Sequence, residues 1–315
     1  MINILVKKYC IACSVLFDIG AKKRYYIDVR RFVFSRSDNK NYGGAMEIGI
    51  STGCLYPELT ENSIRILTEL GFKRLEVFFN TFSEMEIDYL DRLKRLLDSH
   101  GARVVSVHPF ISSFESFMLF SAYERRFRDG ARFYEKFYRA VARIGADKVV
   151  LHGLNTSYSS TITNDEYFRR FSVMQHNARS YGVELLQENV NIFRSSDPSF
   201  ISDMRKSIPG EASFVLDLKQ TLRAGIDPVE MIKAMGTRLR HVHISDRTAQ
   251  GQCMLPFFGS YDLEGFIESL AANGYNGDII IEVYRTSFGS VEDMVRSAQL
   301  LDSAVKRISM GAGHH

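Results

Sequence analysis

The sequence predicts a single (β/α)8 barrel over residues 46–309. Eight short runs rich in Val, Ile, Leu and Phe alternate with amphipathic helical segments. The runs begin 26 to 44 residues apart, which suits one strand and one helix per unit. A chain of 315 residues with 45% hydrophobic content can bury the core of such a barrel. A doubly wound open sheet is the alternative, but no Gly-rich phosphate loop follows an early strand.

The predicted strands are near-continuous apolar runs, as is typical of parallel strands that are covered on both faces. In chain order they span residues 47–52, 74–79, 103–110, 147–154, 183–190, 213–220, 239–246 and 278–285. Several of the helical segments between them end in Gly, which favours helix termination. The residues expected to cap the N-termini of helices are Thr60, Asp165, Asp197, Asp227 and Asp262.

Residues 1–45 show no clear periodicity, and we expect them to form an extension outside the core. Two explanations of this extension stay open. It is disordered, or translation starts at a later codon and these residues are not part of the protein. Residues 310–315 are expected to form a tail. No run of roughly 18 apolar residues predicts a membrane helix. Four cysteines are too few for a disulfide framework, so a cytoplasmic protein is expected.

The distribution of charge argues against a nucleic-acid partner. The chain has 40 Lys and Arg and 37 Asp and Glu, and residues 1–46 contain nine of the basic and three of the acidic residues. The remainder therefore holds 31 basic and 34 acidic residues, a net charge of −3. A protein that binds the phosphate backbone needs a concentrated basic surface, which this balance does not supply.

Polar side chains interrupt seven of the eight predicted strands, mostly toward the carboxyl end of the strand. They are Glu76, His108, His152, Glu188, Asp217, His243 and Glu282. In a (β/α)8 barrel the carboxyl ends of the strands meet at one mouth, where active sites are built. The sequence therefore predicts a polar site at that mouth.

Four of these residues form a candidate metal-binding set, namely Glu188, Asp217, His243 and Glu282. A single His or Glu on a strand is usually a packing or ion-pair residue, but here the feature recurs on four successive strands. Three carboxylates in one buried cup would repel one another, and a divalent cation removes this repulsion. Three oxygen donors and one nitrogen suit one ion of Mn²⁺, Mg²⁺, Co²⁺ or Zn²⁺. His241 should lie one layer deeper than His243 and support it.

At these positions the sequence resembles the xylose isomerase-like barrel superfamily, in particular its sugar phosphate isomerase/epimerase group. The resemblance spans about residues 46–305. The segments that show it are GISTGC at the first strand, QEN around Glu188, VLD at Asp217, HVHISD at His243 with the following Pro256, and GYNGDIIIEVY at the last strand. The order Glu, Asp, His, Glu on strands five to eight is specific to the superfamily, although it says little about the substrate.

The resemblance implies that Glu188 and Glu282 bind the metal and also donate and accept protons at the substrate carbon. It implies that Asp217 and His243 are metal ligands only. The expected substrate-binding residues are His108, His152, Gln220, Arg247 and Glu76. One departure stands out, because many members have Asp-x-x-His on the sixth strand and this chain has Gln220 in place of that histidine. An amide can form hydrogen bonds but cannot titrate.

The predicted function is a divalent-metal-dependent isomerase or epimerase of a small sugar, sugar phosphate or cyclic polyol that reacts through an enediolate. A metal-dependent dehydratase of the inosose or dehydroshikimate type is the alternative within enzymes. A sugar-binding barrel without turnover is the non-enzymatic alternative. The endonuclease branch of the superfamily is disfavoured, because the loop TAQGQCML lacks the Asp-x-His pair that its additional zinc ions require. Assembly into a homo-oligomer stays open.

Overall fold

The computed structural model describes residues 14–18, 24–28, 46–158 and 162–311. The chain divides into two compact units, Met1–Asp38 and Asn39–His315. In the first unit, β1 (Ser14–Asp18) pairs antiparallel with β2 (Arg24–Asp28). These two strands fall within the expected extension, for which the sequence pattern predicts no strand. The rest of that extension and the tail residues 312–315 lie outside the described residues.

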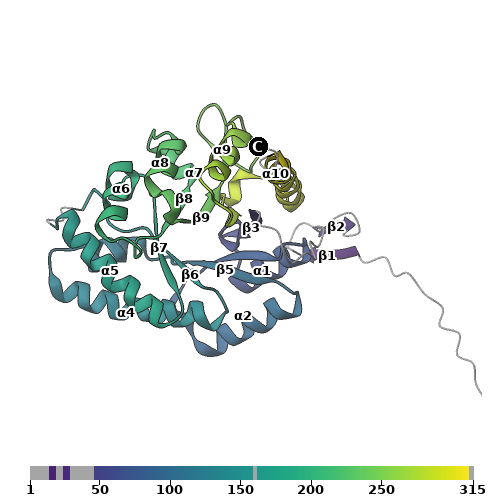
Figure 1. Ribbon diagram of the computed structural model, residues 1–315. Coiled ribbons are helices and arrows are strands. Elements are labelled where there is room, and N and C mark those ends of the chain that lie inside the picture. The colour runs from purple at the N-terminus through teal and green to yellow at the C-terminus, as the bar shows by residue number, and fades with distance from the viewer. Residues whose placement is uncertain (1–13, 19–23, 29–45, 159–161, 312–315) are drawn as a thin grey trace, which may run out of the picture. The chain divides into compact units, whose positions relative to one another are not determined.

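The second unit is a closed barrel of eight parallel strands, as the sequence predicts (Figure 1). Around the barrel the strand order is β12-β3-β4-β5-β6-β7-β8-β9. The strands are β3 (Glu47–Ser51), β4 (Arg74–Phe78), β5 (Arg103–His108), β6 (Lys148–Leu151), β7 (Glu184–Glu188), β8 (Phe214–Asp217), β9 (Leu239–Ile244) and β12 (Asp278–Ile281). A short antiparallel pair, β10 (Asp246–Arg247) and β11 (Cys253–Met254), follows β9 at the mouth.

Each predicted strand contains one observed strand, but the observed strands end earlier. One such difference lies at β8, which ends at Asp217, whereas the predicted strand runs to residue 220. The side chain of Asp217 accepts a hydrogen bond from the backbone nitrogen of Gln220 at 2.9 Å and caps a short helix, α7 (Leu218–Arg223). Because Asp217 caps a helix that begins at the next residue, the strand cannot continue beyond it.

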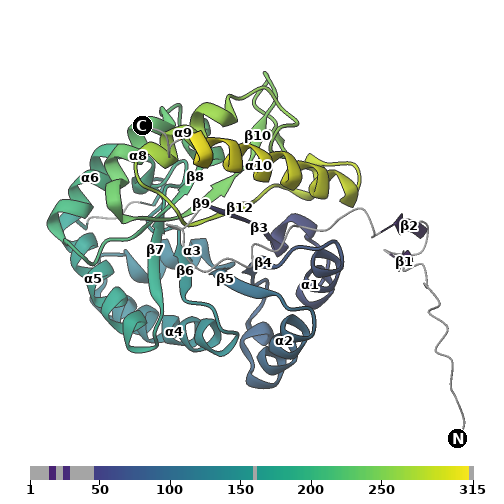
Figure 2. The ribbon, with the colours of Figure 1, turned by 45° about the vertical axis from the view of Figure 1, so that its right-hand side comes forward.

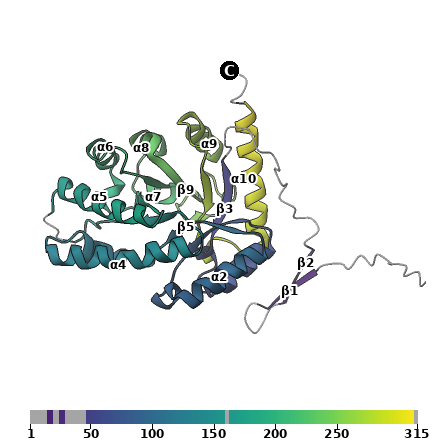
Figure 3. The ribbon, with the colours of Figure 1, turned by 60° about the horizontal axis from the view of Figure 1, so that its bottom comes forward.

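Helices follow the strands and surround the barrel. They are α1 (Thr60–Glu69), α2 (Ile87–Ser99), α4 (Glu124–Arg143), α5 (Asn164–Ser180), α6 (Pro198–Ser207), α8 (Pro228–Met235), α9 (Leu263–Ala272) and α10 (Val291–Gly311). Figure 2 shows α10 lying against β3 and beside α9, and Figure 3 shows α2 and α4 side by side. A short helix, α3 (Ser112–Phe114), continues into a π-helical turn (Glu115–Leu119) after β5. None of the described helices is long and apolar enough to span a membrane.

Three of the five expected helix caps are confirmed. The side chains of Asp197, Asp227 and Asp262 accept backbone hydrogen bonds at the starts of α6, α8 and α9. The other two expectations are wrong. Thr60 is the first residue of α1 and follows the cap position. Helix α5 is capped by Thr163, not Asp165, because the Thr163 hydroxyl accepts from the backbone nitrogen of Glu166 at 3.2 Å.

The barrel strands are almost wholly buried, which explains why they appear in the sequence as continuous apolar runs. Val150, Leu186 and Val215, on the adjacent strands β6, β7 and β8, form one fully buried cluster. The barrel closes where β12 pairs with β3 and Ile280 lies opposite Gly49. A Cβ on Gly49 would overlap the side chain of Ile280, so a larger residue would disturb this closure.

Candidate metal centre

The structure brings together the four residues that the sequence analysis groups as metal ligands. One ligand atom from each of Glu188, Asp217, His243 and Glu282 lies within 4.8 Å of every other. Strand register explains part of this convergence, because Asp217 on β8 lies directly beside His243 on β9. Glu188 ends β7, and Glu282 follows β12, which also pairs with β9. The carboxyl ends of four neighbouring strands therefore place four donor groups around one point.

The atoms of this set face one another. Nδ1 of His243 lies 3.1 Å from Oε1 of Glu188 and 3.6 Å from Oε2 of Glu282. Asp217 uses Oδ1 to cap α7, while its buried Oδ2 has no hydrogen-bond partner. A buried carboxylate oxygen that accepts no hydrogen bond is unfavourable, and a cation beside it compensates this cost.

These residues fit a divalent ion. Their donors are three carboxylates and one imidazole, which suit an ion that prefers oxygen and nitrogen. Two ligands about 2.1 Å from one ion lie at most about 4.2 Å apart, close to the separation within this set, so small side-chain movements would complete coordination. Oδ2 of Asp217, which forms no hydrogen bond and lies 3.3 Å from the ammonium of Lys219, supplies a further argument, because it already lies beside a positive charge.

Charge at the centre is unevenly distributed. Burial raises the pKa of Asp217 to about 7, and the neighbouring Glu282 and Glu188 carboxylates contribute in the same direction, against the effect of Lys219. Burial also acts to raise the pKa of Glu282, but the positive charges of Lys219 and His243 outweigh this effect and lower the pKa to about 2. Near neutral pH the metal-free centre thus holds a partly protonated Asp217 beside ionised glutamates, a sign of crowded negative charge.

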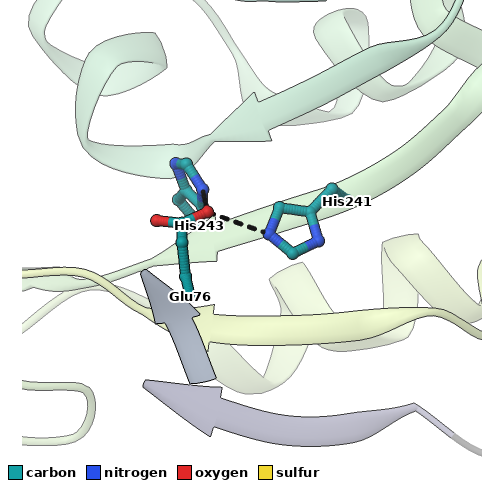
Figure 4. A group of neighbouring side chains, drawn as sticks. All are labelled: Glu76, His241 and His243. Atoms are coloured by element: carbon teal, nitrogen blue, oxygen red, sulfur yellow. Dashed lines mark hydrogen bonds and ion pairs between the residues drawn. The ribbon is translucent and has the colours of Figure 1, made fainter. Parts of the chain in front are cut away.

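Glu76, which the sequence analysis assigns to the substrate, lies beneath His243. It is fully buried on β4, and its Oε2 lies 2.9 Å from Nε2 of His243 (Figure 4). The same oxygen accepts from the hydroxyl of Ser106 at 2.8 Å and lies 3.3 Å from Nε2 of His241. His241 is fully buried one layer deeper, where the sequence analysis expects it. Glu76 thus fixes the ring of His243 and leaves Nδ1 directed at Glu188.

Burial alone would lower the pKa of both histidines. It lowers that of His241, whereas the carboxylates of Glu76 and Glu282 hold the pKa of His243 well above its usual value. The two carboxylates that face the ring, Glu76 at Nε2 and Glu188 at Nδ1, therefore both favour its protonated form.

His108 and His152 lie on the other side of Glu188. Their Nε2 atoms are 3.8 Å and 3.5 Å from Oε2 of Glu188, and their rings meet edge to face at 4.7 Å. The ring of His108 also stacks on Phe78 at 4.8 Å. Together with Glu188 they form a second group of closely spaced donor atoms. Both imidazoles can therefore exchange protons with the carboxylate or contact a ligand bound to it.

The two remaining expected substrate residues lie farther out. The side-chain oxygen of Gln220 accepts a hydrogen bond from the backbone nitrogen of Asn191 at 3.2 Å, so the amide braces the loop after β7. Arg247 is half-buried at the rim, with its guanidinium over the ring of Tyr261 at 5.7 Å. The neighbouring Asp246 holds this rim by accepting backbone hydrogen bonds from Gly259 and Tyr261.

Two polar residues at the site are absent from the sequence-based set. Lys219 is buried, and its Nζ lies 2.9 Å from Oε2 of Glu282 and 3.3 Å from Oδ2 of Asp217. Glu115 is fully buried, and its Oε2 accepts from the backbone nitrogens of His152 and Gly153 at 2.8 Å each. Its Oε1 accepts from the hydroxyl of Tyr134 at 2.5 Å and lies 3.7 Å from Nδ1 of His152, so Glu115 holds the backbone at His152 in place.

The sequence offers a signal for each of these residues. Glu115 is the only charged residue in the apolar segment 110–122, and an isolated carboxylate in such a segment needs partners. For Lys219 the signal is its place in the sequence, two residues after the predicted ligand Asp217. The sequence pattern assigns it to a strand, whereas in the structure it lies in the first turn of α7.

The fold and this cluster together define a (β/α)8 barrel whose mouth carries side chains that could hold a divalent ion. The chain belongs to the xylose isomerase-like TIM barrel family, whose model matches residues 64–304. It is 23% identical to an uncharacterized protein of Mycobacterium leprae over 277 residues, which cover 82% of this chain and 95% of the relative.

Solved structures of low sequence identity share the fold. A D-tagatose 3-epimerase-like protein superposes with a TM-score of 0.71 at 20% identity, covering 85% of this chain and 100% of that protein. The structure of an L-ribulose 3-epimerase gives a TM-score of 0.70 at 15% identity, covering 85% and 97%. The fold is therefore shared with proteins that are described as sugar epimerases.

Proposed function

We propose that the protein is a divalent-metal-dependent epimerase or isomerase of a small ketose or related polyol. The proposal rests on one observation, that the carboxylates of Glu188 and Glu282 both flank Nδ1 of His243. Two ionisable groups around one centre are the arrangement that moving a proton between two faces of a carbon requires. The structural similarity to a D-tagatose 3-epimerase-like protein and an L-ribulose 3-epimerase supports a ketose.

The proposed mechanism assigns separate roles to these side chains. One glutamate accepts the proton from the carbon next to the substrate carbonyl, and the other returns a proton to the opposite face. A divalent ion would stabilise the negative charge on the substrate oxygens. Asp217 and His243 would hold that ion together with Glu188 and Glu282, and Glu76 fixes the ring of His243 with Nδ1 toward Glu188. His108 and His152, both near Oε2 of Glu188, would exchange protons with it or bind hydroxyl groups.

A metal-dependent dehydratase is the second candidate. It shares the proton abstraction step, and the imidazoles of His108 and His152 could protonate a departing hydroxyl group. NMR of the product formed in deuterated water separates the two. An epimerase incorporates one deuteron at the inverted carbon, whereas a dehydratase releases water and leaves a double bond.

The experiment is a screen of ketoses, inososes and dehydroshikimate with added Mn²⁺, followed by the variants Glu188→Gln and Glu282→Gln. Loss of an acid/base group should lower kcat by about 10² to 10⁴-fold. Glu264→Gln, an exposed glutamate on α9, is the matched control and should retain wild-type turnover. Full activity of Glu282→Gln would rule out the mechanism. A protein that sugars stabilise without any turnover would instead be a binding barrel.

A further inference from the structure

A lysine ammonium contacts two of the carboxylates that would hold the proposed ion. Lys219 comes from the start of α7, and its side chain is 8% exposed. Its Nζ contacts Oε2 of Glu282 at 2.9 Å and Oδ2 of Asp217 at 3.3 Å. Both carboxylates belong to the four-residue set that could hold a metal. The same oxygens are thus available to two cations, one built into the chain and one from solution.

The two cations affect the centre in opposite ways. Without an ion, the ammonium compensates carboxylates whose burial would otherwise be costly. With an ion bound, an ammonium at contact distance of the same oxygens repels it, because like charges a few ångströms apart interact strongly away from water. We propose that Lys219 is an internal competitor of the metal, which stabilises the metal-free barrel and weakens binding of a divalent ion. This inference rests on the metal-dependent function proposed above.

A tyrosine ring offers the ammonium a second partner. While it contacts Glu282, Nζ of Lys219 also lies 5.2 Å from the centre of the Tyr284 ring, a distance at which a cation is attracted to an aromatic face. Tyr284 is held there by Arg223, whose Nη1 donates to the tyrosine hydroxyl at 2.8 Å. The lysine stem is flexible, so the ammonium can move away from Glu282 toward the ring when an ion binds.

Direct titration of Mn²⁺ into the full chain tests the competition, because it measures metal binding without requiring turnover. Lys219→Met keeps the length of the side chain and removes the charge. Its Kd for Mn²⁺ should be at least tenfold lower than that of the wild type, equal to about 1.4 kcal/mol. Its melting temperature in EDTA should also be lower than that of the wild type, because the buried carboxylates have lost their counter-ion. Lys219→Gln is the second variant if Lys219→Met does not fold.

Lys233→Met is the matched control. It removes one exposed positive charge from α8, a helix that supplies none of the four candidate ligands. Its Kd for Mn²⁺ should change less than threefold, a small fraction of the effect expected at Lys219.

The outcomes separate this inference from the proposed function. If the wild type binds Mn²⁺ and the Lys219 variants bind it equally or more weakly, the lysine is not a competitor, while metal dependence stands. If the variants bind Mn²⁺ and the wild type does not, the competition is supported and metal dependence of the wild type fails. If neither binds, both are overturned.

Discussion

Oε2 of Glu76 lies 2.9 Å from Nε2 of His243, although the two residues are 167 positions apart in the chain. They come from β4 and β9, between which β3 and β12 intervene in the barrel. The contact therefore crosses the barrel interior, and Figure 4 shows the carboxylate of Glu76 beside the ring of His243. A carboxylate bound to one imidazole nitrogen orients the ring and raises the basicity of the other nitrogen, which would face the metal.

Replacing Glu76 with Gln should weaken metal binding. The amide lacks the charge of the carboxylate, so the ring of His243 would be less firmly oriented and its Nδ1 less basic. We therefore expect a roughly 10- to 100-fold rise in the Kd for Mn²⁺. Calorimetric titration of Mn²⁺ into the variant and the wild type measures this Kd. Ser106→Ala is the control, because it removes another hydrogen bond to the same oxygen without touching His243. Equal Kd values for Glu76→Gln and the wild type would contradict this role.

Metal binding should stabilise the fold against heat. An ion that binds only the folded chain adds about 2.7 kcal/mol at a concentration 100 times its Kd. We expect the melting temperature to rise with Mn²⁺ and to return to its initial value with EDTA. Asp217→Asn should remove this rise. Asp262→Ala is the control, because Asp262 caps α9 and is not a proposed ligand. This variant should lower the melting temperature without Mn²⁺ and leave the rise with Mn²⁺ intact. A rise that persists in Asp217→Asn would place the ion elsewhere.

The pH dependence of the unfolding free energy, measured in EDTA, should show that the folded protein raises the pKa of His108. Burial lowers the pKa of His108, but the Glu188 and Glu76 carboxylates raise it more, to about 9 in the folded state against 6.5 for an ordinary histidine. A raised pKa means that the contribution to stability is complete below pH 6.5 and disappears as pH rises through 9. The difference in unfolding free energy between the wild type and His108→Gln should shrink over that range. A difference independent of pH from 6 to 10 would show that His108 does not bind a proton on folding.

The barrel and the convergence of the four candidate ligands could be predicted because both leave local patterns in the sequence. Buried parallel strands give apolar runs, and a polar residue that ends such a run, as Glu188 and Asp217 do, is visible without any structure. What could not be predicted depends on contacts across the barrel. The partner of Glu76 is set by which strands face each other, and a one-dimensional pattern does not contain that information.

Lys219 illustrates the same limit at short range. In an extended strand it would point to the same face as Asp217, but β8 ends there and α7 begins, so its direction depends on a helix start. The sequence pattern extends the strand to residue 220 and includes Lys219 in it. It does not predict the short helix, because Asp217 is expected to be a metal ligand and not also a helix cap.

Gly153 allows a test of how tightly the mouth is packed. It follows His152 with φ +91°, and a Cβ there would overlap the hydroxyl oxygen of Tyr167. That hydroxyl donates to Oε1 of Gln187 at 2.6 Å, and Nε2 of Gln187 donates to the carbonyl oxygen of His152 at 2.9 Å. A methyl group would therefore disturb a buried network that holds the end of β6 in place.

Gly153→Ala should destabilise the protein by the sum of two costs, about 1–2 kcal/mol for the left-handed backbone and about 1–3 kcal/mol for overpacking. Gly182→Ala is the matched control, because Gly182 has φ +73° and nothing within 4 Å of its Cβ position, so only the first cost applies. Urea unfolding of both variants measures the difference. Equal losses would mean that the Tyr167 and Gln187 side chains move aside freely, and that the mouth around His152 is loosely packed.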